Sequence, residues 1–180
     1  MNDVVDLTLV RHTAVDVPRG VCYGATDVPL AATFEAEADV VAARLRELLP
    51  FDRVFTSPLS RCRRLASYCG YPDAEVDARL AEMDFGEWEM KCYDEISDPR
   101  LQLWYDDWLN VAPTGGESFI DQQRRFASFL RDHAADGRLL LFTHGGILTQ
   151  ARVLSGVTAE EAFRTQPPFG SVIQCTIHDS

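Results

Sequence analysis

The stretch LTLVRHTAVD, residues 7–16, places an arginine and a histidine directly after four strand-forming residues. Residues 7–10 have the pattern of a short buried strand, and Arg11 and His12 lie where this strand gives way to a polar loop. Basic side chains at the end of a buried strand are costly unless solvent or a ligand meets them. This position is therefore the first candidate for a binding site.

The same arrangement occurs at the ends of two further expected strands. Residues 53–56 are followed by a Ser-Pro loop that leads to Arg61, and residues 139–142 are followed closely by His144 and two glycines. The sequence LLLF at 139–142 is apolar throughout, which is typical of a strand buried on both faces of a parallel sheet. The other expected elements are strands at 75–76 and 171–177 and helices that begin near residues 33, 57, 117 and 146.

The alternation of strands and helices predicts an α/β fold, a three-layer α/β/α sandwich around a mostly parallel sheet. A chain of 180 residues with 46% hydrophobic composition suits one core, so residues 1–180 are expected to form a single domain. The aromatic and acidic segment 84–113 is expected to form short helices and to act as a lid or specificity segment. Its tryptophans and Tyr105 are interpreted as packing residues, with an aromatic wall for a flat base as the alternative.

Charge and composition argue against several partners. Seventeen Lys and Arg against 28 Asp and Glu give a formal net charge of −11, which disfavours nucleic acid and anionic membranes. No run approaches the roughly 20 apolar residues of a membrane helix. The first ten residues carry two acids where a signal peptide would carry bases, so a cytoplasmic location is expected. The five cysteines form no CxxC pair and are interpreted as reduced thiols that serve packing, with Cys22 alone left unassigned because it lies in a loop near the expected site.

The three strand ends are expected to meet in one pocket, because ligands bind beyond the carboxyl ends of parallel strands. Arg11, His12, Arg61 and His144 would make that pocket positive within an acidic protein. Phosphate fits it, since arginine binds phosphate oxygens in a bidentate manner and the two glycines after His144 allow close backbone approach. A metal site is the alternative. Neighbouring arginines would repel a divalent cation, so neither a metal nor another cofactor is expected.

A histidine beside bound phosphate can act as a nucleophile, because neutral imidazole is nucleophilic near pH 7 and arginines offset the charge of the phosphoryl group. Such an attack gives a phosphohistidine, and the leaving alcohol then needs a proton from a nearby carboxylic acid. Glu82, in RLAEMDFGEWE at 79–89, is the candidate for this acid.

Five motifs, in order along the chain, resemble those of the histidine phosphatase superfamily, whose members share the phosphoglycerate-mutase-like fold. They are LVRHT at 9–13, CYGATDVPL at 22–30, TSPLSRCRRLA at 56–66, AEMDFGEWE at 81–89 and FTHGGIL at 142–148. Within the superfamily, the chain most resembles the α-ribazole phosphatases of the cobalamin pathway. This finer likeness rests on FGEWEM at 85–90, the spacing of Trp104 and Trp108, and PTGGES at 113–118.

The resemblance implies a role for each residue of the expected site. His12 would be the nucleophile, Glu82 the proton donor and His144 a phosphate ligand that stabilises the transferring group. The implied phosphate-binding residues are Arg11, Arg61 and, through its backbone, Gly145.

One departure from the superfamily pattern falls in the loop after the Arg-His pair. Members have Gly or Ala next and an Asn several residues later, whereas this chain has Thr13 and, near the expected Asn, Val17 and Pro18. A phosphate contact is therefore expected to be missing or replaced. Thr13 and the loop around Tyr23 and Gly24 are the candidate substrate-binding replacements.

Two hypotheses from different classes follow. The first is a metal-independent phosphomonoesterase that acts through phosphohistidine on a small molecule. Its expected substrate is α-ribazole 5′-phosphate, and the alternatives are a broad-specificity phosphatase and a phosphoglycerate-mutase-like enzyme. The second is a non-catalytic phospholigand-binding module on the same scaffold. The presence of every expected catalytic side chain favours the enzyme.

Overall fold

The computed structural model describes residues 4–178 and contains a five-stranded sheet. Its strands are β1 (Val4–Arg11), β2 (Arg53–Thr56), β3 (Glu75–Val76), β4 (Arg138–Thr143) and β5 (Val172–His178). They lie in the order β3-β2-β4-β1-β5, with β1 to β4 parallel and β5 antiparallel to β1. The ends of the expected domain 1–180, residues 1–3 and 179–180, lie outside the described residues.

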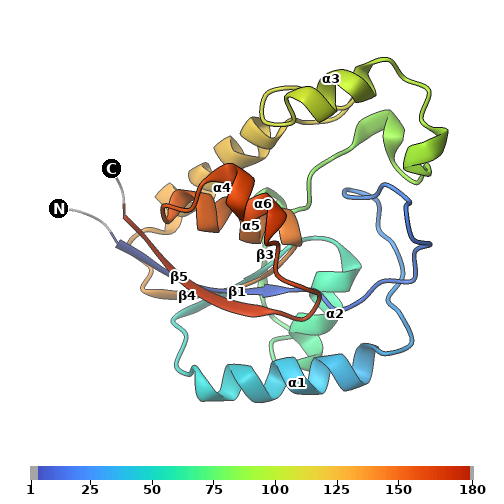
Figure 1. Cartoon of the computed structure of the whole chain (residues 1–180). Helices are drawn as coiled ribbons and strands as arrows, with labels where there is room; N and C mark the ends of the chain where they lie inside the picture. Colours follow the sequence, from blue (N-terminus) through green and yellow to red (C-terminus); the bar gives the residue numbers. More distant parts are fainter. Residues whose placement is uncertain (1–3, 179–180) are drawn as a thin grey trace.

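Helices cover both faces of the sheet (Figure 1). α1 (Phe34–Glu47) and α2 (Ser60–Tyr68) pack on one face, and α4 (Phe119–His133) and α5 (Gly145–Leu154) pack on the other. The shorter elements are α3 (Arg100–Asp106), α6 (Ala159–Arg164), which packs against α5, and the 3₁₀ turns η1 (Ala78–Leu80), η2 (Gly86–Trp88) and η3 (Tyr93–Glu95). The predicted three-layer α/β fold with a mostly parallel sheet is confirmed.

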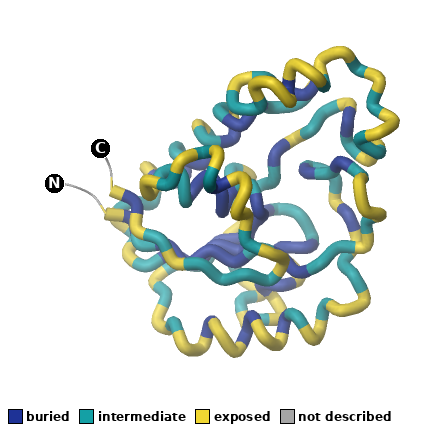
Figure 2. The backbone as a smooth tube through the Cα atoms, viewed as in Figure 1, coloured by how far each residue is buried: buried dark blue, intermediate teal, exposed yellow. Residues whose placement is uncertain are grey.

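Two hydrophobic cores, one on each face of the sheet, follow from the alternation of side chains along the strands. Leu139 and Leu141 of β4 pack toward α4 and α5, whereas Leu140 and Phe142 pack toward α1 and α2. All four side chains are fully buried, and Figure 2 shows the central strands as a buried layer between helices with exposed outer faces. The expectation that residues 139–142 are buried on both faces is confirmed.

The register of the parallel strands brings three strand ends to one edge of the sheet. Arg11 pairs with Thr143, and Phe142 pairs with Thr56. Because β5 runs antiparallel to β1, the loop that precedes β5 returns to the same edge, where the backbone N–H of Arg11 donates to the carbonyl of Ser171. Four chain segments therefore meet beyond the carboxyl ends of the strands.

Several element ends differ from the sequence prediction. The helix expected from Ser57 begins at Ser60, because the Ser-Pro pair still belongs to the loop. The helix expected from Glu117 begins at Phe119, since the side chain of Ser118 accepts from the backbone of Asp121 and caps the first turn. The structure adds α6, whose six residues are too few to show a helical period in the sequence.

Segment 84–113 stands off the sheet (Figure 1) and forms η2, η3 and α3, as predicted for short helices. It has a small core of its own, in which the rings of Trp88 and Trp104 meet edge to face with centroids 6.0 Å apart and Cys22 is buried against them. Asp98 ties the segment together by accepting hydrogen bonds from Nε1 of Trp88 and Oγ1 of Thr114.

None of the helices within residues 4–178 has the length and apolar composition to cross a membrane. The cytoplasmic location expected from the sequence stays a prediction.

Candidate active site

The ends of β1, β2 and β4 bring His12, Arg61 and His144 together at one edge of the sheet. The imidazole rings of His12 and His144 lie 5.2 Å apart between centroids and meet edge to face. Arg61, in the first turn of α2, is fully buried and does not point toward bulk solvent. The strand ends thus converge as the sequence predicts.

The backbone holds His12 in one tautomer. Its Nδ1 lies 2.8 Å from the carbonyl oxygen of Thr13, and because a carbonyl can only accept, Nδ1 carries the hydrogen and donates it. Nε2 therefore keeps its lone pair. Burial, reinforced by the positive charges of Arg61 and Arg11, lowers the pKa of His12 to about 3. The ring is neutral near pH 7, which is the nucleophilic state of imidazole.

His144 is the N-cap residue of α5 and is fully buried. Its Nε2 shares a 2.7 Å hydrogen bond with Oγ of Ser57, and Sγ of Cys62 lies 3.4 Å from the same nitrogen. Burial, followed by the repulsion that a protonated His12 would add and the charge of Arg61, lowers the pKa of His144 well below its ordinary value. Both imidazoles are therefore neutral, and the positive charge of the site comes from its arginines.

Backbone carbonyls fix the guanidinium groups of both site arginines. Arg61 donates from Nη1 to the carbonyl of Thr26 at 2.8 Å and from Nη2 to the carbonyl of Gly24 at 2.6 Å. Arg11 donates from Nη1 to the carbonyl of Pro167 at 2.6 Å. The Nε atoms of both arginines are buried and have no hydrogen-bond partner among residues 4–178. Each side chain is held in place and retains a donor that no described protein atom uses.

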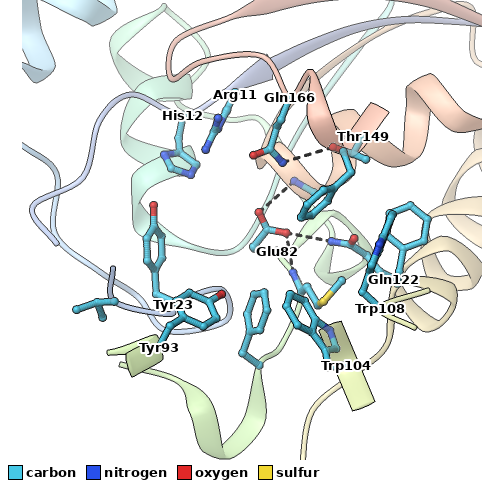
Figure 3. A pocket seen from close by; sticks show the side chains of 16 residues that line it. Arg11, His12, Tyr23, Glu82, Tyr93, Trp104, Trp108, Gln122, Thr149 and Gln166 are labelled. Atoms are coloured by element: carbon cyan, nitrogen blue, oxygen red, sulfur yellow. Dashed lines mark hydrogen bonds between the residues drawn. The ribbon is translucent and has the colours of Figure 1, made fainter. Parts of the chain in front are cut away.

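A cavity of about 260 Å³ opens beside His12 and carries Glu82 in its wall (Figure 3). Oε1 of Glu82 accepts hydrogen bonds from the backbone N–H of Met83 at 2.8 Å and from Nε2 of Gln122 at 3.2 Å. Oε2 accepts from the backbone N–H of Gly146 at 3.1 Å. A Cβ at Gly146 would lie 2.1 Å from Oε1, so any other residue at this position would displace the carboxyl group of Glu82.

The structure divides the predicted site residues between the cavity wall and the layer behind it. Those that line the cavity are Arg11, His12, Tyr23 and Glu82. Those that lie outside the described lining are Thr13, Gly24, Arg61, His144 and Gly145.

Two of the candidate substrate-binding residues have close contacts within the protein. Thr13 is fully buried, and its hydroxyl has no hydrogen-bond partner in the described part of the chain. Gly24 lies so close to Met83 that a Cβ would be 1.9 Å from the Met83 carbonyl oxygen. Its backbone contacts Arg61 instead of lining the cavity. The substrate-binding role of both residues stays a prediction.

Several cavity residues carry no recognisable signal in the sequence. Gln122 and Thr149 are buried polar residues on the inner faces of α4 and α5, and Gln166 follows α6 and reaches the cavity from the loop before β5. Aromatic side chains form the largest group in the lining: Tyr23, Phe85, Tyr93, Trp104, Trp108, Phe119 and Phe163. Within residues 4–178, no group of three or more His, Cys, Asp or Glu side chains is arranged to hold a metal ion.

The neutral, buried state of His12 predicts a loss of stability in acid. Its pKa is about 3 in the folded protein against 6.5 ordinarily, so between these values the unfolded chain binds a proton that the folded chain does not. The free energy of unfolding should be unaffected by this group above about pH 6.5 and fall by about 1.4 kcal/mol per pH unit below it. Urea unfolding between pH 7 and pH 4 measures the slope.

The matched variants for this pH experiment are His12→Asn and His178→Asn. His178 is exposed at the end of β5, so its replacement removes an imidazole without altering the buried site. His12→Asn should make the slope shallower by about 1.4 kcal/mol per pH unit. Equal slopes for the His12 variant and the wild type would contradict the prediction.

The fold belongs to an established class of α/β proteins. Residues 7–180 match the model of the histidine phosphatase superfamily (branch 1). The chain belongs to this superfamily, and it is a phosphatase.

Curated relatives and a solved structure support this assignment. The adenosylcobalamin/alpha-ribazole phosphatase of Salmonella typhimurium is 33% identical over 153 residues, which cover 79% of this chain and 75% of the relative. A Klebsiella pneumoniae protein named "Probable phosphoglycerate mutase GpmB" is 34% identical over 155 residues, which cover 79% of this chain and 70% of that protein. The crystal structure of phosphoglycerate mutase from Thermus thermophilus has a TM-score of 0.75 and 32% identity, covering 94% of this chain and 92% of that one.

Proposed function

We propose that this phosphatase hydrolyses phosphomonoesters in two steps through a phosphohistidine at Nε2 of His12. The observation that carries the proposal is the 2.8 Å hydrogen bond from Nδ1 to the Thr13 carbonyl, which leaves Nε2 unprotonated in a buried, neutral ring. The charges of Arg11 and Arg61 act on the same ring and would attract the phosphate group of the ester.

In the first step, the lone pair of His12 Nε2 forms a bond to phosphorus while the bond from phosphorus to the ester oxygen breaks. The leaving oxygen takes a proton from the carboxylic acid of Glu82 and departs as an alcohol. The imidazole then carries the phosphoryl group on Nε2 and a hydrogen on Nδ1. The Thr13 carbonyl continues to accept the Nδ1 hydrogen, which stabilises the positive charge on the ring.

In the second step, water attacks phosphorus while the carboxylate of Glu82 takes a proton from that water. The bond from phosphorus to nitrogen breaks, and its electrons return to Nε2 of His12. The products are inorganic phosphate, neutral His12 and protonated Glu82, so the cycle closes with every atom and proton accounted for.

We assign the phosphate group to Arg11, Arg61, His144 and the backbone of Gly145. Leaving a buried donor unsatisfied costs about 1–3 kcal/mol. A phosphate oxygen would satisfy the buried Nε atoms of the two arginines, which have no partner among residues 4–178. Gly145 begins α5, and the first N–H groups of a helix are free to bind an anion. Ser57 orients the neutral ring of His144.

We infer α-ribazole 5′-phosphate as the substrate from the aromatic part of the cavity wall. Tyr93, Trp104 and Trp108 belong to segment 84–113 and line the cavity (Figure 3), so we assign this segment to substrate specificity. A flat base packs well against such rings. Nε1 of Trp104 is buried without a partner among residues 4–178 and would donate to a ring nitrogen. The Salmonella typhimurium relative is named an adenosylcobalamin/alpha-ribazole phosphatase, which supports this choice.

Phosphoglycerate suits the cavity less well. It carries a carboxylate in addition to its phosphate, and Arg11 is the only cationic side chain in the described lining. An unpaired carboxylate in a largely aromatic cavity is costly.

The substrate proposal is tested by kcat/KM in the presence of EDTA for α-ribazole 5′-phosphate, 3-phosphoglycerate and glycerol phosphate. We expect α-ribazole 5′-phosphate to be preferred by about a hundredfold, because ring contacts contribute roughly 1 kcal/mol each beyond the buried area. Trp108→Ala should lower kcat/KM about tenfold for α-ribazole 5′-phosphate and less than about threefold for glycerol phosphate.

The matched control for Trp108 is Tyr105→Ala, which lies in the same segment, is 52% exposed and does not line the cavity. This variant should keep the wild-type preference. Equal kcat/KM for 3-phosphoglycerate and α-ribazole 5′-phosphate would contradict the substrate assignment. Phosphate binding without turnover of any ester would favour a phospholigand-binding module.

A further inference from the structure

The carboxylate of Glu89 accepts four hydrogen bonds from backbone and side-chain donors. Oε1 accepts from the backbone N–H groups of Ala25 at 2.7 Å and Phe85 at 3.2 Å. Oε2 accepts from the backbone N–H of Gly24 at 3.0 Å and from Oγ1 of Thr26 at 2.8 Å. One half-buried side chain thus joins loop 24–26 to segment 84–113.

The same loop holds the guanidinium group of Arg61. The carbonyl of Gly24 accepts from Nη2 at 2.6 Å, and the carbonyl of Thr26 accepts from Nη1 at 2.8 Å. Gly24 and Thr26 therefore each bond to Glu89 on one side and to Arg61 on the other. The preceding residue, Tyr23, lines the cavity.

Loop 24–26 has little freedom to adjust by itself. A Cβ at Gly24 would lie 1.9 Å from the carbonyl oxygen of Met83 and 2.9 Å from the ring of Phe85. The loop therefore packs directly against the chain that leads into η2. The orientation of its two Arg61-binding carbonyls depends on what holds its N–H groups, and Glu89 holds two of them.

We propose that Glu89 is a positioning residue, whose carboxylate fixes loop 24–26 so that its carbonyls hold the Arg61 guanidinium in a phosphate-binding orientation. This inference rests on the proposed function, in which Arg61 binds phosphate. Glu89 is absent from the described cavity lining. Its replacement should weaken phosphate binding through Arg61 and not through a lost contact with the ligand.

The test is the Kd of inorganic phosphate, measured by titration calorimetry on the full chain. Glu89→Gln should raise Kd about tenfold, because a carboxamide has one acceptor oxygen and turns its own N–H group toward the loop donors. The matched control is Asp98→Asn. Asp98 also ties segment 84–113 together, but its partners are Trp88, Arg100 and Thr114. The Asp98→Asn variant should lower Tm while changing the Kd of inorganic phosphate less than about twofold.

A double-mutant cycle with Arg61→Lys separates an effect through Arg61 from general destabilisation, because general destabilisation by Glu89→Gln would be the same in both backgrounds. If Glu89 acts through the Arg61 guanidinium, Glu89→Gln should raise Kd less than about twofold in the Arg61→Lys background. A full additional tenfold rise there would overturn the inference. So would an unchanged Kd in Glu89→Gln, or equal rises in Kd for Glu89→Gln and Asp98→Asn.

Thr26→Val keeps the inference testable if Glu89→Gln does not fold. It removes one of the four hydrogen bonds to Glu89 and should raise Kd about two- to threefold. An unchanged Kd in this variant would overturn the inference while leaving the proposed function intact. Absence of phosphate binding by the wild type would overturn the proposed function itself, and the inference with it.

Discussion

Alanine at position 12 is expected to abolish turnover and the covalent phosphoenzyme together. His12 would supply the lone pair that bonds to phosphorus, and loss of a nucleophile lowers kcat on the order of 10⁴-fold or more. Rapid quenching of the wild type without acid should trap a phosphate label that is labile in acid and stable in alkali. His12→Ala should lack this label, as measured with a radiolabelled ester.

Ser57 is the rival nucleophile, because its Oγ lies 2.7 Å from Nε2 of His144 and a serine beside a histidine can also be activated. A phosphoserine would resist acid and yield to alkali, which is the opposite stability. Persistence of label in His12→Ala, or its recovery on Ser57, would contradict the mechanism. His178→Ala, at an exposed position in β5, should retain both label and activity.

Glutamine at position 82 is expected to separate substrates by their leaving groups. A carboxamide keeps the size of the side chain but cannot give a proton to the departing oxygen. Alkyl phosphates need that proton, whereas 4-nitrophenyl phosphate releases a stable anion. We expect kcat/KM of Glu82→Gln to fall about 10²- to 10³-fold for alkyl esters and less than about tenfold for the nitrophenyl ester.

Glu117→Gln is the control for Glu82. Its carboxylate pairs with Arg125 and accepts from the backbone of Asp84 outside the described cavity lining, so any loss should be equal for the two kinds of ester. Equal losses of kcat/KM for alkyl and nitrophenyl esters in Glu82→Gln would contradict the proton-donor role of Glu82.

The fold and the centre of the site follow from local patterns in the sequence. The uninterrupted run at 139–142 marks a strand buried on both faces, and this is where β4 lies. Because the carboxyl ends of parallel strands share one edge, an Arg-His pair after one strand and a His after another must meet there. The rings of His12 and His144 do lie close together, with centroids 5.2 Å apart.

The outer wall of the cavity could not be predicted in the same way. Phe163 reaches the cavity from α6, a six-residue helix without a readable period. Trp108 stacks on Phe163 with ring centroids 4.8 Å apart, although the two residues lie far apart in the sequence. Such contacts depend on how far segment 84–113 stands from the sheet, and neither composition nor periodicity encodes that distance.

The loops beside His12 and Arg61 show a different limit. The resemblance marks Thr13 and Gly24 as candidate replacements for a missing family residue, and it does not indicate that their backbone carbonyls accept from His12 and Arg61. A carbonyl acceptor exists at every residue type, so the sequence cannot indicate which one fixes a tautomer or holds a guanidinium. The role of Glu89 could not be predicted for the same reason. A carboxylate that accepts from backbone N–H groups has no characteristic sequence spacing to its partners.

The antiparallel direction of β5 determines which loops of this fold can accept an insertion. Its leading connection, residues 165–171, closes one side of the active site, with Gln166 in the cavity and Pro167 bonded to Arg11. The turns that precede β2 and β4 lie at the amino ends of these parallel strands, on the side of the sheet away from the active site. We therefore expect an insertion in those turns to leave the cavity lining unchanged, whereas an insertion within 165–171 should displace Gln166 and the carbonyl that accepts from Arg11.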